Sequence, residues 1–271
     1  EYWEDSESST LTDYQHAQSV LKELEEEIQS STPLSSLLSG QHIVLDPGHG
    51  GMDPGAIVTV KDGNGNPLTV TEDEYAYDIA IRLYKILRRH GASVSLTVLA
   101  PDHLSREGEN PRQTFVNKKN EVYNNESHNG NAGWRPVGTA EGLDMRKETA
   151  RQQINRAPLL AKRKGTLFLS IHADNSPELP AGRAVLFFGA TEEEKESSRE
   201  LAQCLASKLG SGAFIKEQTL RVLQNNPADA AVLVETRNVY YERNCWALRS
   251  PELREQDAQM LAAGILKWCR R

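Results

Sequence analysis

The chain has 271 residues, of which 38% are hydrophobic and 25% are charged, and its formal net charge is -7. Such a length and composition indicate a globular protein with one large or two small domains. The negative charge and the absence of a basic stripe in the sequence argue against nucleic acid as the main partner. No apolar run in the sequence approaches the ~18 residues that a membrane-spanning helix requires.

The first residue of the chain and its three cysteines indicate how the protein is modified after synthesis. The chain begins at Glu1 rather than methionine, so we expect a processed or trimmed product. The chain has three cysteines, Cys204, Cys245 and Cys269, and their spacing is not that of a metal site. Because three cysteines cannot all pair within one chain, their disulfide state stays open.

Residues 1–40 are expected to form an N-terminal segment with an acidic tail, a helix and a linker. Residues 1–10 are acidic and rich in serine, which predicts disorder. An amphipathic helix follows, because apolar residues recur with helical spacing at Tyr14, Ala17, Leu21, Leu24 and Ile28. This helix either packs on its own domain or forms a short coiled coil, and the pattern does not choose between them. Ser30–Gly40 has the composition of a linker.

Residues 41–271 alternate between strand-like and helical patterns. This alternation predicts an α/β domain with a mostly parallel, twisted sheet and helices on both faces. The expected strands are His42–Leu45, Ala92–Val98, Thr166–Ile171, Ala184–Phe188 and Ala231–Val234. The expected helices are Asp73–Arg89, Glu192–Leu209 and Glu255–Trp268, and Met145–Lys162 also has a helical pattern.

An insertion, Pro101–Gly142, interrupts this alternation. Its forty or so residues are rich in Asn, Gly, Glu and Pro and have little periodicity. A loop of this length in a compact domain is usually a lid, a binding loop or disordered. We expect it to border the active-site crevice, the alternative being an excursion that points away. It carries His103, His128 and Trp134, and lone histidines in such a loop are expected to be solvated.

A histidine lies in the tightest part of the turn after the first expected strand. Residues 43–56 read IVLDPGHGGMDPGA, and glycines flank His49 on both sides. Glycine removes steric bulk around the imidazole and allows a positive φ. We interpret His49 as a metal ligand or a catalytic base, against the alternative of a polar residue in an ordinary loop.

Three further side chains are expected to join His49. His172 and Glu235 each end a predicted strand, and the carboxyl ends of parallel strands share one edge of a sheet. Glu72 begins the helix after the first strand. It shares a helical stripe with Ala76, Ile79 and Leu83 that should face the sheet, whereas Glu74 lies on a neighbouring side. A carboxylate on a buried stripe needs a partner, and a cation would provide one.

These residue types predict a catalytic zinc site. Two His and one Glu with an open position are a ligand set of catalytic Zn²⁺, and no Cys lies near these motifs to close a structural site. His49, Glu72 and His172 are therefore the expected metal ligands. Glu235 is then free to act as the general base on water. The alternative for Glu235 is an ion pair with Arg237 at the end of a buried strand.

The motifs LDPGHGGMDPGA at 45–56, SIHAD at 170–174 and VLVET at 232–236 resemble the zinc-dependent N-acetylmuramoyl-L-alanine amidases of the amidase-3 type. The resemblance covers roughly residues 41–100 and 150–271. It implies one zinc held by His49, Glu72 and His172, with Glu235 as general base. The implied reaction is hydrolysis of the amide between N-acetylmuramic acid and L-alanine of the peptidoglycan stem peptide, by an exported periplasmic or cell-wall protein.

This chain departs from the family pattern beside the expected site. Asp174 stands where the family often has Asn, Arg237-Asn238 where it usually has Gly-Phe, and Tyr241 where it has Asn. These differences bear on substrate detail more than on chemistry. Two rival functions are a zinc peptidase such as a carboxypeptidase and an inactive wall-binding regulatory domain. The need for a protein activator and the oligomeric state are left open.

Overall fold

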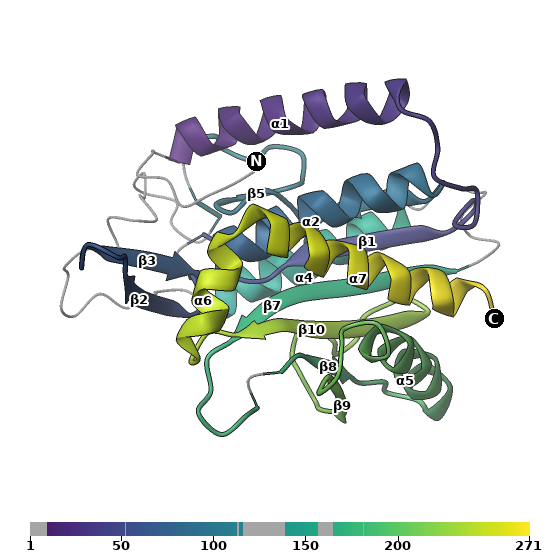
Figure 1. Ribbon diagram of the computed structural model, residues 1–271. Coiled ribbons are helices and arrows are strands. Elements are labelled where there is room, and N and C mark those ends of the chain that lie inside the picture. The colour runs from purple at the N-terminus through teal and green to yellow at the C-terminus, as the bar shows by residue number, and fades with distance from the viewer. Residues whose placement is uncertain (1–9, 52, 113, 116–138, 157–164, 181) are drawn as a thin grey trace.

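The computed structural model describes residues 10–51, 53–112, 114–115, 139–156, 165–180 and 182–271. A six-stranded sheet in the order β4-β1-β7-β10-β8-β9 forms its centre (Figure 1). Its strands are β4 (Ser93–Leu96), β1 (His42–Pro47), β7 (Thr166–Asp174), β10 (Ala230–Asn238), β8 (Ala184–Phe187) and β9 (Phe214–Glu217). The first four are parallel to one another, whereas β8 runs antiparallel to β10 and parallel to β9. The predicted mostly parallel α/β fold is thus confirmed.

Helices cover both faces of this sheet. On one face lie α2 (Glu72–Arg89), α7 (Pro251–Cys269) and α5 (Glu192–Ala206), and on the other lies α4 (Thr139–Asn155). Alternate residues of β1 divide between the two faces, because Ile43 and Leu45 join the larger hydrophobic cluster and Val44 joins the smaller one. Burial on both faces explains why the central strands are continuous apolar runs.

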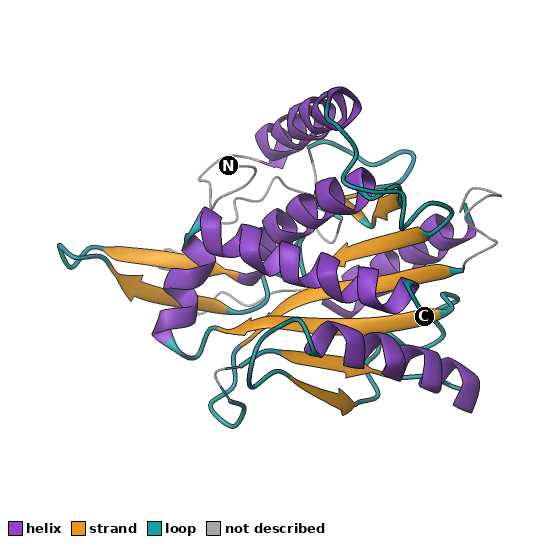
Figure 2. Ribbon diagram, turned by 45° about the vertical axis from the view of Figure 1, so that its right-hand side comes forward, coloured by secondary structure: helices purple, strands orange, loops and turns teal. Residues whose placement is uncertain are grey.

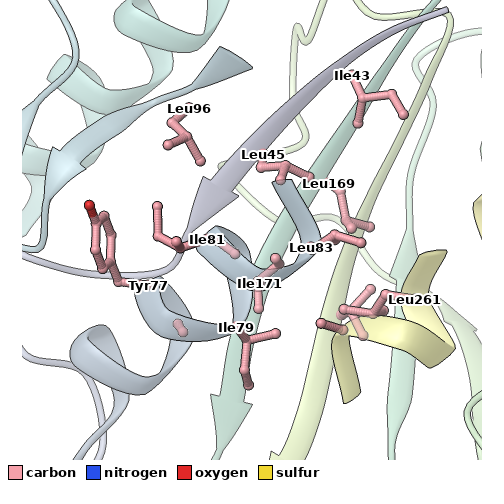
Figure 3. Packing of buried hydrophobic residues seen from close by; sticks show 14 of the residues in the cluster. Ile43, Leu45, Tyr77, Ile79, Ile81, Leu83, Leu96, Leu169, Ile171 and Leu261 are labelled. Atoms are coloured by element: carbon pink, nitrogen blue, oxygen red, sulfur yellow. The ribbon is translucent and has the colours of Figure 1, made fainter. Parts of the chain in front are cut away.

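The larger hydrophobic cluster packs α2 and α7 against the sheet. Ile79 and Leu83 of α2 and Leu261 of α7 gather over Leu169 and Ile171 of β7 (Figure 3). Each of these five side chains is at most 1% exposed. This packing holds the first residue of α2, Glu72, in a fixed position relative to the sheet.

The helix α1 (Thr10–Ser30) packs on its own chain rather than projecting for a coiled coil. It lies over α2 and β5 (Val98–Ala100) as an outer layer (Figure 1), and its Ala17, Val20 and Leu24 are buried. Glu25 forms an ion pair with Arg88 of α2 at 2.7 Å. The expected disorder of residues 1–10 falls almost entirely outside the described residues.

Several elements differ from the sequence-based expectation. The expected strand Ala92–Val98 is divided, because Thr97 separates β4 from β5, and β5 pairs with β6 (His103–Leu104) instead of joining the main sheet. The hairpin of β2 (Ile57–Lys61) and β3 (Pro67–Thr71) was not anticipated, nor were β9 and α6 (Glu242–Arg249). The β2–β3 hairpin projects from the body of the molecule (Figure 2).

The described residues of the insertion include regular elements, which its low periodicity did not predict. It contains β6, and α4 begins within it at Thr139. His103 is fully buried instead of solvated, since its ring makes an edge contact with Tyr14 of α1 at 5.0 Å between centroids. Burial lowers the pKa of His103 to about 4. His128 and Trp134 lie outside the described residues. Among the helices that are described, none is both long and apolar enough to cross a membrane.

Candidate metal site and active site

Three of the predicted residues meet at the carboxyl edge of the parallel strands. One ligand atom from each of His49, Glu72 and His172 lies within 4.8 Å of the other two. His49 Nε2 is 3.3 Å from Glu72 Oε2, and His172 Nδ1 is 2.9 Å from Glu72 Oε1. The two imidazole rings stand edge to face with centroids 4.9 Å apart. Within the described residues, this is the one group of His, Cys, Asp and Glu spaced to hold a metal ion.

Backbone amides hold the Glu72 carboxylate in place. Oε2 accepts the N–H of Ala56 at 2.9 Å, and Oε1 accepts the N–H of Ala173 at 2.9 Å. Ala173 follows His172 directly, and Ala56 belongs to the glycine-rich turn that carries His49. The first residue of α2 is therefore bonded to both segments that contribute a histidine.

The predicted stripe on α2 was too simple a reason for selecting Glu72. Every residue of α2 from Glu72 to Leu83 is buried, including Asp73, Glu74 and Asp78, because α1 and α7 cover the sides that the sheet does not. Burial therefore does not distinguish Glu72 from its acidic neighbours. What distinguishes Glu72 is its position at the start of the helix, where it faces the two histidines.

The glycines around the site leave no room for a side chain. A Cβ on Gly48 would lie 2.5 Å from the ring of His172, and one on Gly55 would lie 2.5 Å from Glu72 Oε2 and 2.6 Å from the ring of His49. His49 itself has a φ of 61°, which is uncommon for a residue with a side chain. Such backbone geometry is often found at functional sites.

We expect Gly55→Ala to weaken metal binding strongly, whereas Gly65→Ala should leave it unchanged. Both glycines have positive φ, 71° and 84°, so both substitutions carry a similar backbone cost of roughly 1–2 kcal/mol. A Cβ at Gly65 in the β2–β3 turn meets nothing within 4 Å. Zinc affinity measured by chelator competition would separate the two. Equal zinc affinity in both variants would show that close packing around Glu72 is unimportant.

Glu235 is the neighbour of His172 across the β7–β10 pair. Its Oε2 is buried and has no hydrogen-bond partner in the described part of the chain. The alternative ion pair with Arg237 is not formed. Instead, Arg237 binds Asp257 of α7 through Nε at 2.8 Å and Nη2 at 3.0 Å. The Glu235 carboxylate is thus left available for chemistry at this edge.

The titrating groups form one electrostatic unit. Burial alone would raise the pKa of Glu72, but the charge of His49 and hydrogen bonds from both histidines hold it well below its usual range. Burial opposes protonation of His49, yet Glu72 and Asp53 raise its pKa to about 10. Burial, followed by the charges of Glu72 and Asp174, raises the pKa of Glu235 well above its usual range. This arrangement of acids stabilises a positive charge between them.

A cavity of about 220 Å³ opens beside the two histidines on the face of the sheet that α4 covers. Its lining is mainly apolar. Apolar side chains that line it include Phe115 from the insertion, Leu143 from α4, and Leu220 and Val222 from the loop before β10. Arg221 of that loop binds Asp144 of α4 with both contacts under 3 Å, at 2.7 and 2.8 Å. Two described residues of the insertion, Phe115 and Gly142, therefore border the site.

The family departures have structural roles close to the site. Asn238 donates to the carbonyl of Ser176 at 2.8 Å and accepts the N–H of Ser176 at 3.2 Å, so it ties β10 to the loop after β7. Tyr241 donates to the carbonyl of Leu179 at 3.1 Å in the same loop. Burial raises the pKa of Asp174. These residues shape the loop that follows His172.

Sequence reasoning missed two charged residues in contact with the site. Asp53 lies four residues after His49 and places Oδ2 3.2 Å from its Nδ1. Arg146 of α4 lines the cavity and is only 5% exposed. Asp53 could have been found from the acid in the same turn as the histidine. Arg146 could not, because no local pattern shows where α4 packs.

We expect Glu72→Ala to abolish tight metal binding and Glu74→Ala to affect it little. Glu72 belongs to the three-residue cluster and Glu74 does not. Because Glu74 is only 1% exposed, its replacement should still lower the thermal stability. Metal content and melting temperature, measured on the same samples, separate these effects. The reverse ranking of metal affinity would place the ligand two residues further along α2.

Fold and site together define an α/β protein with a His–Glu–His candidate metal site at the carboxyl edge of its sheet. The family model of N-acetylmuramoyl-L-alanine amidases of the amidase-3 type matches residues 43–267. The chain therefore belongs to this family. Helix α1 lies outside the matched residues.

Individual relatives agree with this assignment. An uncharacterized cell wall amidase of Bacillus anthracis is 25% identical over 243 residues, which cover 86% of this chain and 36% of the relative. The germination-specific N-acetylmuramoyl-L-alanine amidase of Bacillus subtilis is 23% identical, over 87% of this chain and 83% of the relative. This chain spans between 31% and 38% of the length of the first three curated relatives that it matches.

Solved structures share the fold. The CwlD amidase of Clostridioides difficile, in complex with the GerS lipoprotein, is similar with a TM-score of 0.57 and 19% identity, over 84% of this chain and 98% of that one. The amidase AmiC2 of Nostoc punctiforme has a TM-score of 0.54 and 22% identity, over 86% of this chain and 99% of that one.

Proposed function

We propose that this chain is a zinc-dependent N-acetylmuramoyl-L-alanine amidase. It hydrolyses the amide between the lactyl group of N-acetylmuramic acid and L-alanine of the stem peptide. The observation that carries the proposal is the convergence of His49, Glu72 and His172, with Glu235 on the adjacent strand, in a chain of this family.

The residues present fit a zinc ion. Two imidazoles and one carboxylate are a ligand set of catalytic zinc, and three protein ligands leave a position for water or substrate. The buried Glu235 Oε2, with no hydrogen-bond partner in the described part of the chain, also fits such a site. A divalent cation held by the three ligands would take the place of the proton on His49 and lower the pKa of Glu235.

The chain's own residues then divide the work. His49, Glu72 and His172 would hold the ion, and zinc would supply a Lewis acid that polarises the scissile carbonyl and acidifies water. Glu235 accepts the proton of the attacking water through its carboxylate oxygen. It then donates this proton to the nitrogen of the leaving L-alanine. The apolar lining of the cavity beside the histidines would reduce the contact of a bound substrate with water.

We further propose that the protein is exported and acts on peptidoglycan in the periplasm or the cell wall. Support comes from relatives named as cell wall amidases in Bacillus anthracis and Staphylococcus epidermidis. The lipoprotein bound to the similar CwlD structure supports testing a protein activator as an added component of the assay.

The test is zinc analysis of the purified protein combined with mass spectrometry of digested peptidoglycan. An amidase releases intact stem peptides that begin with L-alanine. A carboxypeptidase would instead shorten the peptide from its other end. Bound zinc without turnover on any muropeptide, with and without a candidate activator, would favour an inactive wall-binding domain.

We expect the insertion to influence polymeric substrates more than small ones. Because β6 and the start of α4 are part of the folded domain, only residues 116–138 should be replaced by a short Gly-Ser link. Residues on both sides of this segment border the cavity. If the segment is a lid, it would slow hydrolysis, and if it is a substrate clamp, it would speed hydrolysis. In either case the effect should be larger on the polymer, because only the polymer needs an open groove. Rates on peptidoglycan and on a soluble muropeptide provide the comparison. Equal effects on both, or none, would rule out a substrate-gating role.

A further inference from the structure

Behind His172, on the face of the sheet that α4 covers, lies a set of buried polar side chains that the proposed reaction does not use. Asp46 of β1 and Ser170 of β7 are partners in the parallel register, and they are 1% and 0% exposed. Thr97 after β4 is 0% exposed, and Arg146 of α4 is 5% exposed. Polar groups buried this deeply need mutual hydrogen bonds.

Asp46 is the centre of this set. Its Oδ1 accepts the hydroxyl of Thr97 at 2.6 Å and lies 2.8 Å from Arg146 Nη2. Its Oδ2 accepts the hydroxyl of Ser170 at 2.7 Å. Arg146 Nη2 also donates to the carbonyl of Pro47 at 2.7 Å. Side chains from β7, from the residue after β4 and from α4 therefore hold the Asp46 carboxylate in a fixed orientation.

The set reaches the candidate metal site through Ser170. Its Oγ lies 3.1 Å from His172 Nε2, while His172 Nδ1 lies 2.9 Å from Glu72 Oε1. A carboxylate only accepts hydrogen bonds, so the single hydroxyl proton of Ser170 is directed to Asp46. The lone pairs of Ser170 Oγ are then left to accept a proton, and the partner that can donate one is His172 Nε2–H.

We propose that Asp46 and Ser170 are positioning residues that fix His172, in the metal-bound protein, as the Nε2–H tautomer, with the Nδ1 lone pair facing the metal position. The other histidine has a simpler arrangement. The carboxylate of Asp53 lies 3.2 Å from His49 Nδ1, and His49 Nε2 faces Glu72. The two histidines thus present different ring nitrogens to the ion. Partners of this kind orient metal ligands and raise their basicity.

This inference rests on the proposed metal role of His172, and the chain provides a matched pair of variants to test it. Ser170→Ala and Thr97→Val each remove one buried hydroxyl that donates to Asp46. Only Ser170 also contacts His172. The two substitutions should therefore weaken the Asp46 set alike and differ in their effect on the histidine.

We expect Ser170→Ala to weaken zinc affinity by about 10–100-fold in a chelator competition with zinc alone, and Thr97→Val to weaken it far less. The melting temperatures of the metal-free variants should fall by similar amounts. Equal zinc affinities in the two variants would overturn the inference. Absence of zinc binding by the unsubstituted protein would instead contradict the proposed function.

A second measurement needs no substitution. In the zinc-bound protein, ¹⁵N-detected NMR of labelled histidines distinguishes a protonated Nε2 from a protonated Nδ1. We expect His172 to carry its proton on Nε2 and His49 to carry it on Nδ1. A proton on Nδ1 of His172 would mean coordination through the opposite nitrogen, and would overturn the inference.

Discussion

Glu235→Gln is expected to lower amidase turnover by about 10²–10⁴-fold while the bound zinc stays unchanged, because loss of a positioned general base typically has an effect of this size. Glutamine has nearly the same shape but accepts no proton at neutral pH. Glu235 is not among the three clustered ligand residues, so metal binding does not depend on its charge. The measurement is the rate on a soluble muropeptide together with zinc content.

A surface variant serves as the control for Glu235→Gln. Glu196→Gln also replaces a carboxylate by an amide, but on the exposed side of α5, where Glu196 pairs with Arg199. Its turnover should equal that of the unsubstituted protein. Near-normal turnover of Glu235→Gln would show that another group is the base. Loss of zinc from this variant would place Glu235 among the ligands instead.

His172→Ala is expected to lose zinc and activity together, and His49→Ala should behave in the same way. Removing either imidazole leaves a carboxylate and one nitrogen at the site. Changes in outer residues alone typically cost 10–100-fold in metal affinity, so loss of a direct ligand should exceed ~100-fold. Metal analysis after dialysis, with turnover on the same samples, is the measurement.

The exposed His16 on α1 provides the comparison for these two variants. His16→Ala should keep zinc and turnover, since His16 is outside the metal cluster. Full zinc occupancy in His172→Ala would contradict the assigned ligand set. Zinc lost with activity retained would mean that the reaction does not need the metal.

The sequence was sufficient to predict five of the six strands of the main sheet and where the candidate site residues lie relative to them. Strand-like runs that are followed by His49, His172 and Glu235 predict convergence, because parallel strands share one carboxyl edge. The structure brings His49 and His172 together with Glu72, and it makes Glu235 the neighbour of His172. Their roles as ligands and base stay predictions until the variants above are measured.

Some errors had a recognisable local signal. The β2–β3 hairpin turns at Asp62-Gly63-Asn64-Gly65, a sequence typical of tight turns, but its strands are short and half-exposed. Asp53 lies in the same turn as His49. In both cases the signal is local, because turn residues and the acid that accompanies them lie next to each other in the sequence.

Other features were decided only by the tertiary structure. The sequence by itself determined which residues are apolar, where most of the main strands and helices form, and which side chains follow the strands. It did not determine that α1 and α7 would bury Glu74 and Asp78, that Tyr14 would cover His103, or that Asp46 would lie beside Ser170. These contacts join residues that are far apart along the chain. Periodicity describes one face of one element, whereas burial on the remaining sides depends on which other elements pack there.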